Sequence, residues 1–363
     1  MSSGASGHRG AFFIGNDIMK HAAVLGASGY TGAEAVRLIL GHPKLTLKAM
    51  TAHSRAGEAY SDVFRNYAGQ DLPPLVKLDE VSWDEIDVVF ACLPHGASQE
   101  TIAKIYDRVE TVIDLSADFR LSDPELYAKT YGRPHDFKEL LDERVYGLSE
   151  FSRDKLQGAK LVACPGCYPT SAMLALLPAL KAGLIVADQL IIDAKSGVTG
   201  AGRKATLGFA YSETSDGAQA YAIGTHRHAP EMDQGIHDFA GLTTAVRFTP
   251  HLLPMNRGMI ATCHVSLKDG VSVDELRTHY EKRYESEAFV HVLAEGQVPQ
   301  TRHVRGSNHC QIGIFADRTP NSAVIVSVID NLTKGSSGQA IQNYNLTQGW
   351  DETLGLKGVG VFP

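Results

Sequence analysis

The stretch HAAVLGASGYTGAEAVRLILGH, residues 21–42, decides the fold. Its first five residues form a short apolar segment that is typical of a buried strand. Three glycines then follow at three-residue spacing: Gly26, Gly29 and Gly32. The amphipathic pattern after them predicts a helix over residues 32–40. Strand, glycine-rich turn and helix in this order predict an α/β fold, a Rossmann-like doubly wound parallel sheet.

The same turn predicts a dinucleotide site. Glycines let the backbone approach a pyrophosphate, and the first N–H groups of the helix then point at it. The spacing is G-x-x-G-x-x-G rather than G-x-G-x-x-G, so a purely structural turn is the alternative. The residues that we expect to contact the cofactor here are Gly26, Ser28, Gly29, Tyr30, Thr31 and Gly32.

The next predicted strand, residues 45–50, indicates which cofactor is bound. A cofactor with a free ribose 2′-hydroxyl usually meets an Asp or Glu after this strand. This chain has Ser54 and Arg55 there instead, whose hydroxyl and guanidinium suit a 2′-phosphate. The pattern favours NADP(H) over NAD, and a solvated loop arginine is the alternative.

Further apolar runs predict parallel strands at residues 85–93, 111–115 and 161–163. Ligands of such sheets gather beyond the carboxyl ends of the strands. We therefore expect the nicotinamide half of the cleft to be lined by residues 93–96, with Leu93 and Pro94, and by residues 116–120. Arg120 suits an anionic substrate, or alternatively a plain ion pair. The polar stretch 123–157 predicts a connecting, lid-like region.

A second key stretch, ACPGCYPTSAMLALLPALKAGL, spans residues 163–184. A Pro-Gly turn leads into Cys167 and then into an apolar helix. Cys167 is thereby placed at a helix N-terminus, where the dipole and the unpaired N–H groups lower a thiol pKa. The position predicts a nucleophile, against the alternative of an inert buried cysteine.

A proton partner for this thiol is available in GTHRHAPEMDQGI. His226 and His228 precede a helix that Pro230 can open, and two residues apart on an extended stretch they face the same side. We favour His228 as the acid/base, with His226 as the other candidate. A metal site or a redox pair of Cys164 and Cys167 are weaker alternatives, since no second C-x-x-C is present, and we expect no metal.

A glycine-rich segment, KSGVTGAGR at residues 195–203, predicts an anion-binding loop in which Lys195, Ser196 and Arg203 hold a phosphate or carboxylate. A flexible connector is the alternative. An NADP(H) cleft, a thiolate, a histidine and an anion site together favour hydride transfer through a covalent thioester, with phosphate as the leaving group.

The remaining strands predict a second, α+β domain with a mostly antiparallel sheet. Alternating patterns mark strands at residues 190–195, 243–249, 259–267, 310–316 and 322–329. One sheet face is expected to remain free as an oligomer interface. A loop and helix within 330–350 should return to the first domain. The expected division is 21–165 with 331–363 for NADP binding, 166–330 for catalysis and oligomerisation, and 1–20 as a disordered extension.

Composition excludes several classes of function. The 363 residues carry a net charge of −7, which gives no footprint for nucleic acid or an anionic membrane. No apolar run is long enough for a membrane span. Five cysteines, an odd number, favour a reducing compartment, and we expect a cytoplasmic protein.

In this order, the motifs GASGYTGAE, LPHG, DLSADFRL, PGCYPT, KSGVTGAGR, HRHAPE and DNLTKGSSGQA resemble the N-acetyl-γ-glutamyl-phosphate reductases, a semialdehyde dehydrogenase family related to aspartate-β-semialdehyde dehydrogenases. The resemblance implies NADPH-dependent reduction of an acyl phosphate to a semialdehyde and inorganic phosphate, in arginine biosynthesis. It also implies Cys167 as nucleophile, His228 or His226 as acid/base, and a homodimer or homotetramer. The residues it places at the nicotinamide end are Ser196, Gly197, Asn331 and Lys334.

The chain departs from this pattern at Cys164, where the family commonly has Asn. Two alternatives to the reductase remain open. In the first, the enzyme acts on a carrier-linked aminoadipyl phosphate of lysine biosynthesis. In the second, the chain is a non-catalytic NADP-sensing regulator. The intact Cys167 and the histidine pair argue against the regulator.

Overall fold

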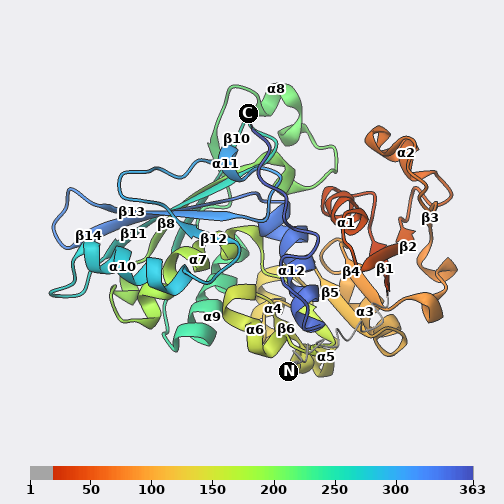
Figure 1. Ribbon diagram of the computed structural model, residues 1–363, viewed down its shortest axis with the longest axis horizontal. Helices are drawn as coiled ribbons and strands as arrows, with labels where there is room; N and C mark the ends of the chain where they lie inside the picture. The colour runs from red at the N-terminus through yellow and green to blue at the C-terminus, as the bar shows by residue number, and fades with distance from the viewer. Residues whose placement is uncertain (1–18, 363) are drawn as a thin grey trace, which may run out of the picture.

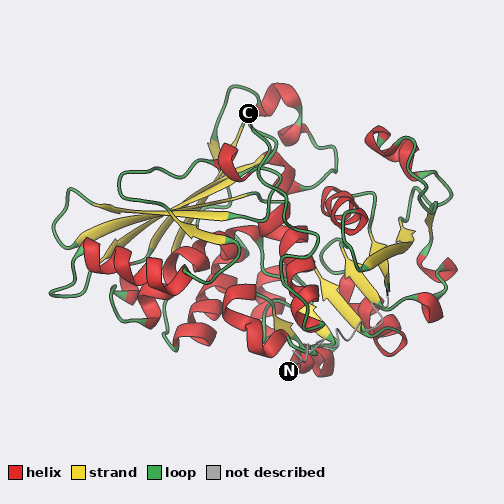
Figure 2. Ribbon diagram, viewed as in Figure 1, coloured by secondary structure: helices red, strands yellow, loops and turns green. Residues whose placement is uncertain are grey.

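The computed structural model describes residues 19–362, whose strands form two sheets lying side by side (Figures 1 and 2). The first sheet has the order β3-β2-β1-β4-β5-β7-β6, and all its pairings are parallel. Its strands are β1 (Lys20–Leu25), β2 (Leu45–Thr51), β3 (Leu75–Val76), β4 (Val88–Ala91), β5 (Thr111–Asp114), β6 (Val145–Tyr146) and β7 (Leu161–Ala163). The chain reverses its winding at β1, so the doubly wound prediction is confirmed.

The second sheet is mixed and mostly antiparallel, as expected. Its order is β12-β13-β14-β11-β8-β10-β9, and only the pairs β8–β10 and β12–β13 are parallel within the described chain. Its strands are β8 (Ile191–Gly197), β9 (Gln219–Ala220), β10 (Arg247–Leu253), β11 (Met259–Ser266), β12 (Val290–Val292), β13 (Cys310–Ala316) and β14 (Ser322–Ile329). The strand expected at 243–249 begins later, because Asp233 of a neighbouring helix binds the N–H of Val246.

The helices α7, α9 and α10 lie along one face of this sheet, whereas the other side carries only the short α8 and α11 at one end in Figures 1 and 2. The strands β8 and β11 alternate between buried and partly exposed residues, as a half-covered sheet requires. The helices are α1 (Tyr30–Leu40), α2 (Tyr60–Val63), α3 (Ser98–Ile105), α4 (Pro124–Tyr131), α5 (Lys138–Glu143), α6 (Ser149–Leu156), α7 (Cys167–Lys181), α8 (Tyr211–Thr214), α9 (His228–Ala240), α10 (Val273–Tyr284), α11 (Thr301–Val304) and α12 (Gly338–Thr347). Among residues 19–362, no helix has the length and apolar character to cross a bilayer.

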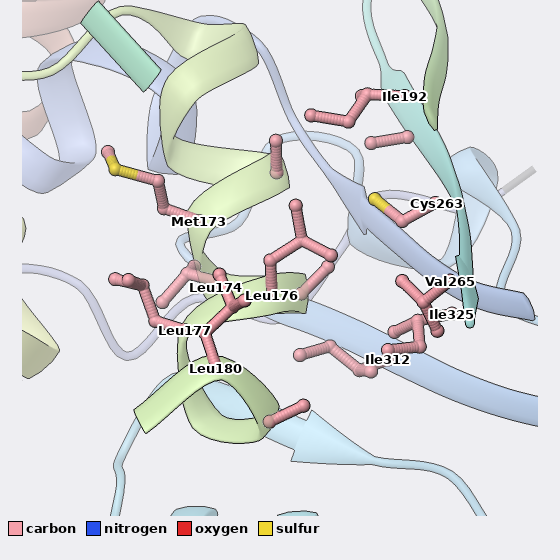
Figure 3. Close-up of a cluster of buried hydrophobic side chains, with 14 of the residues drawn as sticks. Met173, Leu174, Leu176, Leu177, Leu180, Ile192, Cys263, Val265, Ile312 and Ile325 are labelled. Atoms are coloured by element: carbon pink, nitrogen blue, oxygen red, sulfur yellow. The ribbon is translucent and has the colours of Figure 1, made fainter. Parts of the chain in front are cut away.

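The central helix α7 is buried on almost every side (Figure 3). Its leucines and Met173 pack against the sheet and against α9. Pro178 lies inside the helix and has no N–H for the carbonyl of Leu174. The hydroxyl of Tyr284, from α10, donates to that carbonyl at 2.7 Å. A helix held in this way gives its first residue, Cys167, a fixed position.

The last helix, α12, packs against the nucleotide-side elements α1, α6 and β5, as predicted. The amide of Asn343 donates to the carbonyl of Gly147 at 2.7 Å, and the side chains of His42 and Asn345 are bonded at 2.9 Å. A short π-helix, η8 (Thr333–Ser337), links β14 to α12. After β14 the chain therefore leaves the second sheet, and α12 covers part of the first sheet.

The lid-like interpretation of residues 123–157 is wrong. The segment forms α4, α5, β6 and α6, and β6 pairs with β7 as the edge of the parallel sheet. Asp123 caps α4 by accepting from the N–H of Glu125, and Pro124 occupies the first turn. A few fully buried side chains, among them Tyr127 and Leu148, fix a segment whose composition is otherwise polar.

Candidate active site

The glycine turn between β1 and α1 is crowded where the sequence has glycine. Gly26 has φ +74°, and a Cβ there would lie 2.4 Å from the carbonyl oxygen of Cys92. A Cβ at Gly32 would lie 2.5 Å from the carbonyl oxygen of Gly26, whereas Gly29 has more room. No side chain caps α1, so its first N–H groups are left to a ligand. The turn fits a pyrophosphate, with the partly exposed Ser28, Tyr30 and Thr31 around it.

The candidate 2′-phosphate residues lie just beyond the end of β2. Ser54 is exposed, and Arg55 pairs with Glu58 at 2.9 Å, with both side chains partly exposed. The N–H of Ala27 binds the carbonyl of Thr51, so this strand end adjoins the glycine turn. An exposed ion pair of this kind is weak, so little free energy is needed to break it.

The loops after β4 and β5 are held together by one buried carboxylate. Asp118 accepts from the backbone N–H groups of Gly96 at 2.8 Å and Ser98 at 3.0 Å, which caps α3. Burial raises the pKa of the neighbouring Asp114 to about 6, against hydrogen bonds from Ser98 and Ser116. Residues 93–96 and 116–120 therefore share one site, and Leu93 and Pro94 remain accessible at its edge.

Cys167 is the first residue of α7, with Gly166 as the N-cap. Burial raises the pKa of its thiol to about 11, while the Arg120 guanidinium and the N–H of Tyr168 act in the opposite direction. The predicted lowering of this pKa is therefore wrong for the chain without ligands, because desolvation outweighs the helix N-terminus. The thiol is protonated at neutral pH and needs a base.

His228 can serve as that base. It is the first residue of α9, and its ring lies so close to Gly166 that a Cβ there would lie 2.6 Å from Nε2. Burial, together with His226 and Arg120, holds the pKa of His228 well below its usual value. The imidazole is therefore neutral at pH 7; its Nε2 lies 3.4 Å from Nη1 of Arg120, and its Nδ1 has no hydrogen-bond partner within residues 19–362.

His226 lies beside His228 with 4.8 Å between the ring centres. Its Nδ1 accepts from the backbone N–H of His228 at 3.1 Å, and burial and Arg227 lower its pKa to about 4. The two rings meet, as predicted, although the backbone between them is a turn and the start of α9 rather than an extended strand.

Arg120 connects the loop after β5 with the turn before Cys167 and with α9. Its Nε donates to the carbonyl of Cys164 at 2.8 Å and its Nη2 to that of Leu115 at 3.0 Å. Its Nη1 lies 3.5 Å from Glu231. The structure shows the ion pair that the sequence left open as the alternative to an anion clamp, and the guanidinium is buried.

Glu231 is a functional residue that sequence reasoning missed. It is fully buried, and its Oε1 accepts from the N–H of Gly166 at 2.7 Å and from the hydroxyl of Tyr146 at 2.8 Å. This carboxylate thereby fixes the turn before Cys167. The signal was its spacing, since a residue three after His228 lies on the same face of the helix.

Residues 195–197 belong to the end of β8 rather than to a loop. Lys195 pairs with Asp193 at 3.0 Å. A Cβ at Gly200 would lie 3.3 Å from Oγ of Ser196 and 3.8 Å from Nδ2 of Asn331. The amide of Asn331 donates to Thr199 and its oxygen accepts from the N–H of Gly258. Ser196, Gly197 and Asn331 are thus brought together beside η8.

Two predicted ligand residues lie elsewhere. Lys334 is fully buried, and its ammonium binds Glu150 at 2.6 Å and Gln342 at 2.7 Å, so its side chain cannot reach a cofactor. Arg203 donates to the carbonyl of Ser28 at 3.0 Å and stacks over Phe64, so it contacts the glycine turn and not the cysteine turn.

Comparison with known proteins agrees with this geometry. The family model "Semialdehyde dehydrogenase, NAD binding domain" matches residues 21–159, and "Semialdehyde dehydrogenase, dimerisation domain" matches residues 167–331. The N-acetyl-gamma-glutamyl-phosphate reductase of Rhodospirillum rubrum is 51% identical over 94% of this chain and 98% of its own length. The enzyme of the same name from Afipia carboxidovorans is 50% identical over 93% and 97%.

The chain belongs to the N-acetyl-γ-glutamyl-phosphate reductase family.

Solved structures agree with the semialdehyde dehydrogenase fold of this family. Aspartate semialdehyde dehydrogenase II of Vibrio cholerae, complexed with ASA, has a TM-score of 0.68 at 16% identity, covering 90% of this chain and 98% of that one. The Candida albicans aspartate semialdehyde dehydrogenase with NADP has a TM-score of 0.63, also at 16% identity and with the same coverage. At such low identity, the likeness concerns the fold alone. The parallel layer of this reductase-family chain is thus a nicotinamide-cofactor domain.

Proposed function

We propose that the chain reduces N-acetyl-γ-glutamyl phosphate to N-acetylglutamate 5-semialdehyde with NADPH and releases inorganic phosphate, a step of arginine biosynthesis. The observation that carries this proposal is a sequence identity of about 50% to reductases of that name over nearly the whole chain. The juxtaposition of Cys167 and His228 at the starts of two packed helices supports it chemically.

The mechanism follows from the protonation states. Neutral His228 takes the thiol proton of Cys167, and the sulfur attacks the acyl carbon of the substrate. The bond to the phosphate oxygen breaks, its electron pair leaves with phosphate, and a thioester remains on Cys167. NADPH, when bound, supplies the hydride that reduces this thioester. Return of a proton to the sulfur then releases the aldehyde, with Glu231 holding the turn in place throughout.

NADP(H), rather than NAD(H), is supported by Ser54 and Arg55 at the end of β2. We infer a homodimer or homotetramer that associates through the uncovered face of the second sheet, and a reducing compartment such as the cytoplasm, since the cysteines are unpaired. The functional division remains 21–165 with 331–363 for the cofactor and 166–330 for catalysis.

Running the reaction backwards tests the proposal, because acyl phosphates are labile. The protein is mixed with NADP, inorganic phosphate and N-acetylglutamate 5-semialdehyde, and NADPH absorbance is followed, with aspartate semialdehyde in parallel. Phosphate-dependent reduction with the acetylated substrate alone is expected. If neither semialdehyde produces NADPH although NADP binds, the proposal is contradicted. The carrier-linked substrate and the NADP-sensing regulator then remain as interpretations.

A further inference from the structure

Arg227 lies between His226 and His228 in the sequence and directly precedes α9. Its side chain is exposed, and in the described part of the chain its guanidinium has no hydrogen bond and no ion pair. It lies 6.0 Å from the centre of the Tyr131 ring, a loose contact. An arginine with five unused donors at a catalytic turn is a candidate for binding a ligand.

The arginines close to the catalytic histidines and the glycine turn are already engaged, whereas Arg133 lies against Gly96 in the loop after β4. Arg120 binds two backbone carbonyls and Glu231, and Arg203 binds the glycine turn. Arg257 is held between Glu34 and Asp330. Arg227 is therefore a further candidate for binding an anion beside the catalytic cysteine.

The surroundings of Arg227 offer a second donor. The hydroxyl of Tyr131 is buried and has no hydrogen-bond partner among residues 19–362. The Tyr131 ring lies 5.9 Å from the ring of His95, in the loop after β4. Arg227 and Tyr131 thus face each other between the catalytic helices and the nicotinamide edge of the first sheet, and a buried hydroxyl without a partner points to a missing ligand.

The local charge favours an anion. Burial, followed by Arg227, lowers the pKa of His226 to about 4, and burial with Arg227 and Arg120 lowers that of His95 to about 3. Burial is the larger cause for both rings, and the nearby guanidiniums add to it, so neither histidine contributes a positive charge and the guanidiniums carry the local charge. Glu231 accepts hydrogen bonds from Gly166 and Tyr146, and its ion pair is with Arg120.

We propose that Arg227, with the Tyr131 hydroxyl, binds an anionic group of the substrate, either the phosphoryl group or the carboxylate of the acyl phosphate. Both groups present the oxygens that a guanidinium binds in a bidentate manner. This inference rests on the proposed function for the identity of the substrate. The assignment of an oxyanion site at Arg227 depends only on the geometry.

Steady-state kinetics of the reverse reaction tests it and separates the two groups. Arg227→Gln is expected to raise KM for phosphate, if the phosphoryl group binds there, or KM for the semialdehyde, if the carboxylate does, by roughly tenfold to a hundredfold. Arg227→Lys should recover part of the loss, and Tyr131→Phe should raise the same KM several-fold. Arg318→Gln, in the hairpin at the far end of β14, is the matched control. An unchanged KM for both substrates would overturn the proposal.

A second measurement does not depend on turnover. Iodoacetamide alkylation of Cys167, followed by mass spectrometry, should be slowed by inorganic phosphate or by N-acetylglutamate in the wild-type chain and not in Arg227→Gln. Full protection in the variant by both anions would contradict the assignment. If the wild type shows no reaction but protection still depends on Arg227, the proposed function fails while the oxyanion site stands.

Discussion

Gly335 of η8 lies against Cys167 so closely that a Cβ at Gly335 would lie 2.8 Å from the Cβ of Cys167. Gly335→Ala must therefore displace the nucleophile, because the new methyl group also meets Ile329 at 3.2 Å. We expect kcat to fall by roughly a hundredfold, since an error of about 1 Å at a reacting atom has that effect. Gly208→Ala, which meets nothing within 4 Å, is the matched control and should retain full activity.

Replacement of the nucleophile separates chemistry from binding. Cys167→Ser should abolish turnover and leave the Kd for NADP nearly unchanged, because the thiol forms the thioester while the glycine turn binds the cofactor. Cys164→Ser, a buried cysteine bonded to Asn343, should remain active. Fluorescence titration measures the Kd for NADP, and the reverse assay measures turnover. Substantial activity in Cys167→Ser would exclude the thioester route.

The pH dependence of Cys167 alkylation follows from its raised pKa. A thiol with a pKa of about 11 is almost fully protonated at pH 7, so its thiolate fraction rises about tenfold per pH unit. In the ligand-free chain, iodoacetamide alkylation should therefore accelerate steadily from pH 7 to pH 10. A rate that levels off near pH 7 would show instead that the thiolate is the resting form.

Glu231 is expected to be important for stability as well as for geometry. Glu231→Ala removes the acceptor of Gly166 and the carboxylate beside buried Arg120, so unfolding free energy should fall by about 3–5 kcal/mol. Glu231→Gln keeps an acceptor oxygen, so its unfolding free energy should fall by less. Urea unfolding of both variants measures the difference, and equal stability of wild type and Glu231→Ala would refute this role.

Cofactor preference should depend on Arg55. Arg55→Ala is expected to reduce the NADP over NAD ratio of kcat/KM roughly tenfold, through loss of a charge-assisted bond to the 2′-phosphate. Glu58→Gln is the useful comparison, because it removes the partner that competes for Arg55 and should raise the ratio or leave it unchanged. An unaltered ratio in Arg55→Ala would place the 2′-phosphate elsewhere.

Much of the architecture was predictable because it depends on local patterns. The glycine turn at Gly26 and Gly32, the buried parallel strands and the helix that begins at Cys167 all follow from spacing and burial. The return of α12 to the first layer was also predicted. The short edge strands β3, β6, β9 and β12 were not, since two or three residues carry too little pattern.

The errors at the site have a common physical cause: each depends on contacts between residues far apart in the sequence. The pKa of Cys167 depends on burial that α7 receives from the whole second sheet. Arg120 and Lys334 resemble free cations in the sequence, yet each is enclosed by partners from distant segments. Glu231 acquires its role only when α9 packs against α7.

The packing of α12 on the first sheet also affects the order in which the protein folds during synthesis. A ribosome delivers β1 to β7 first, yet the helix that covers this sheet between α1 and α6 is encoded in residues 338–347. The segment that backs the nucleophile, residues 333–337, emerges just before it. A nascent chain therefore finishes neither its cofactor layer nor its catalytic turn until residues 333–347 have been made, and premature termination near residue 330 would yield two unfinished halves rather than one working domain.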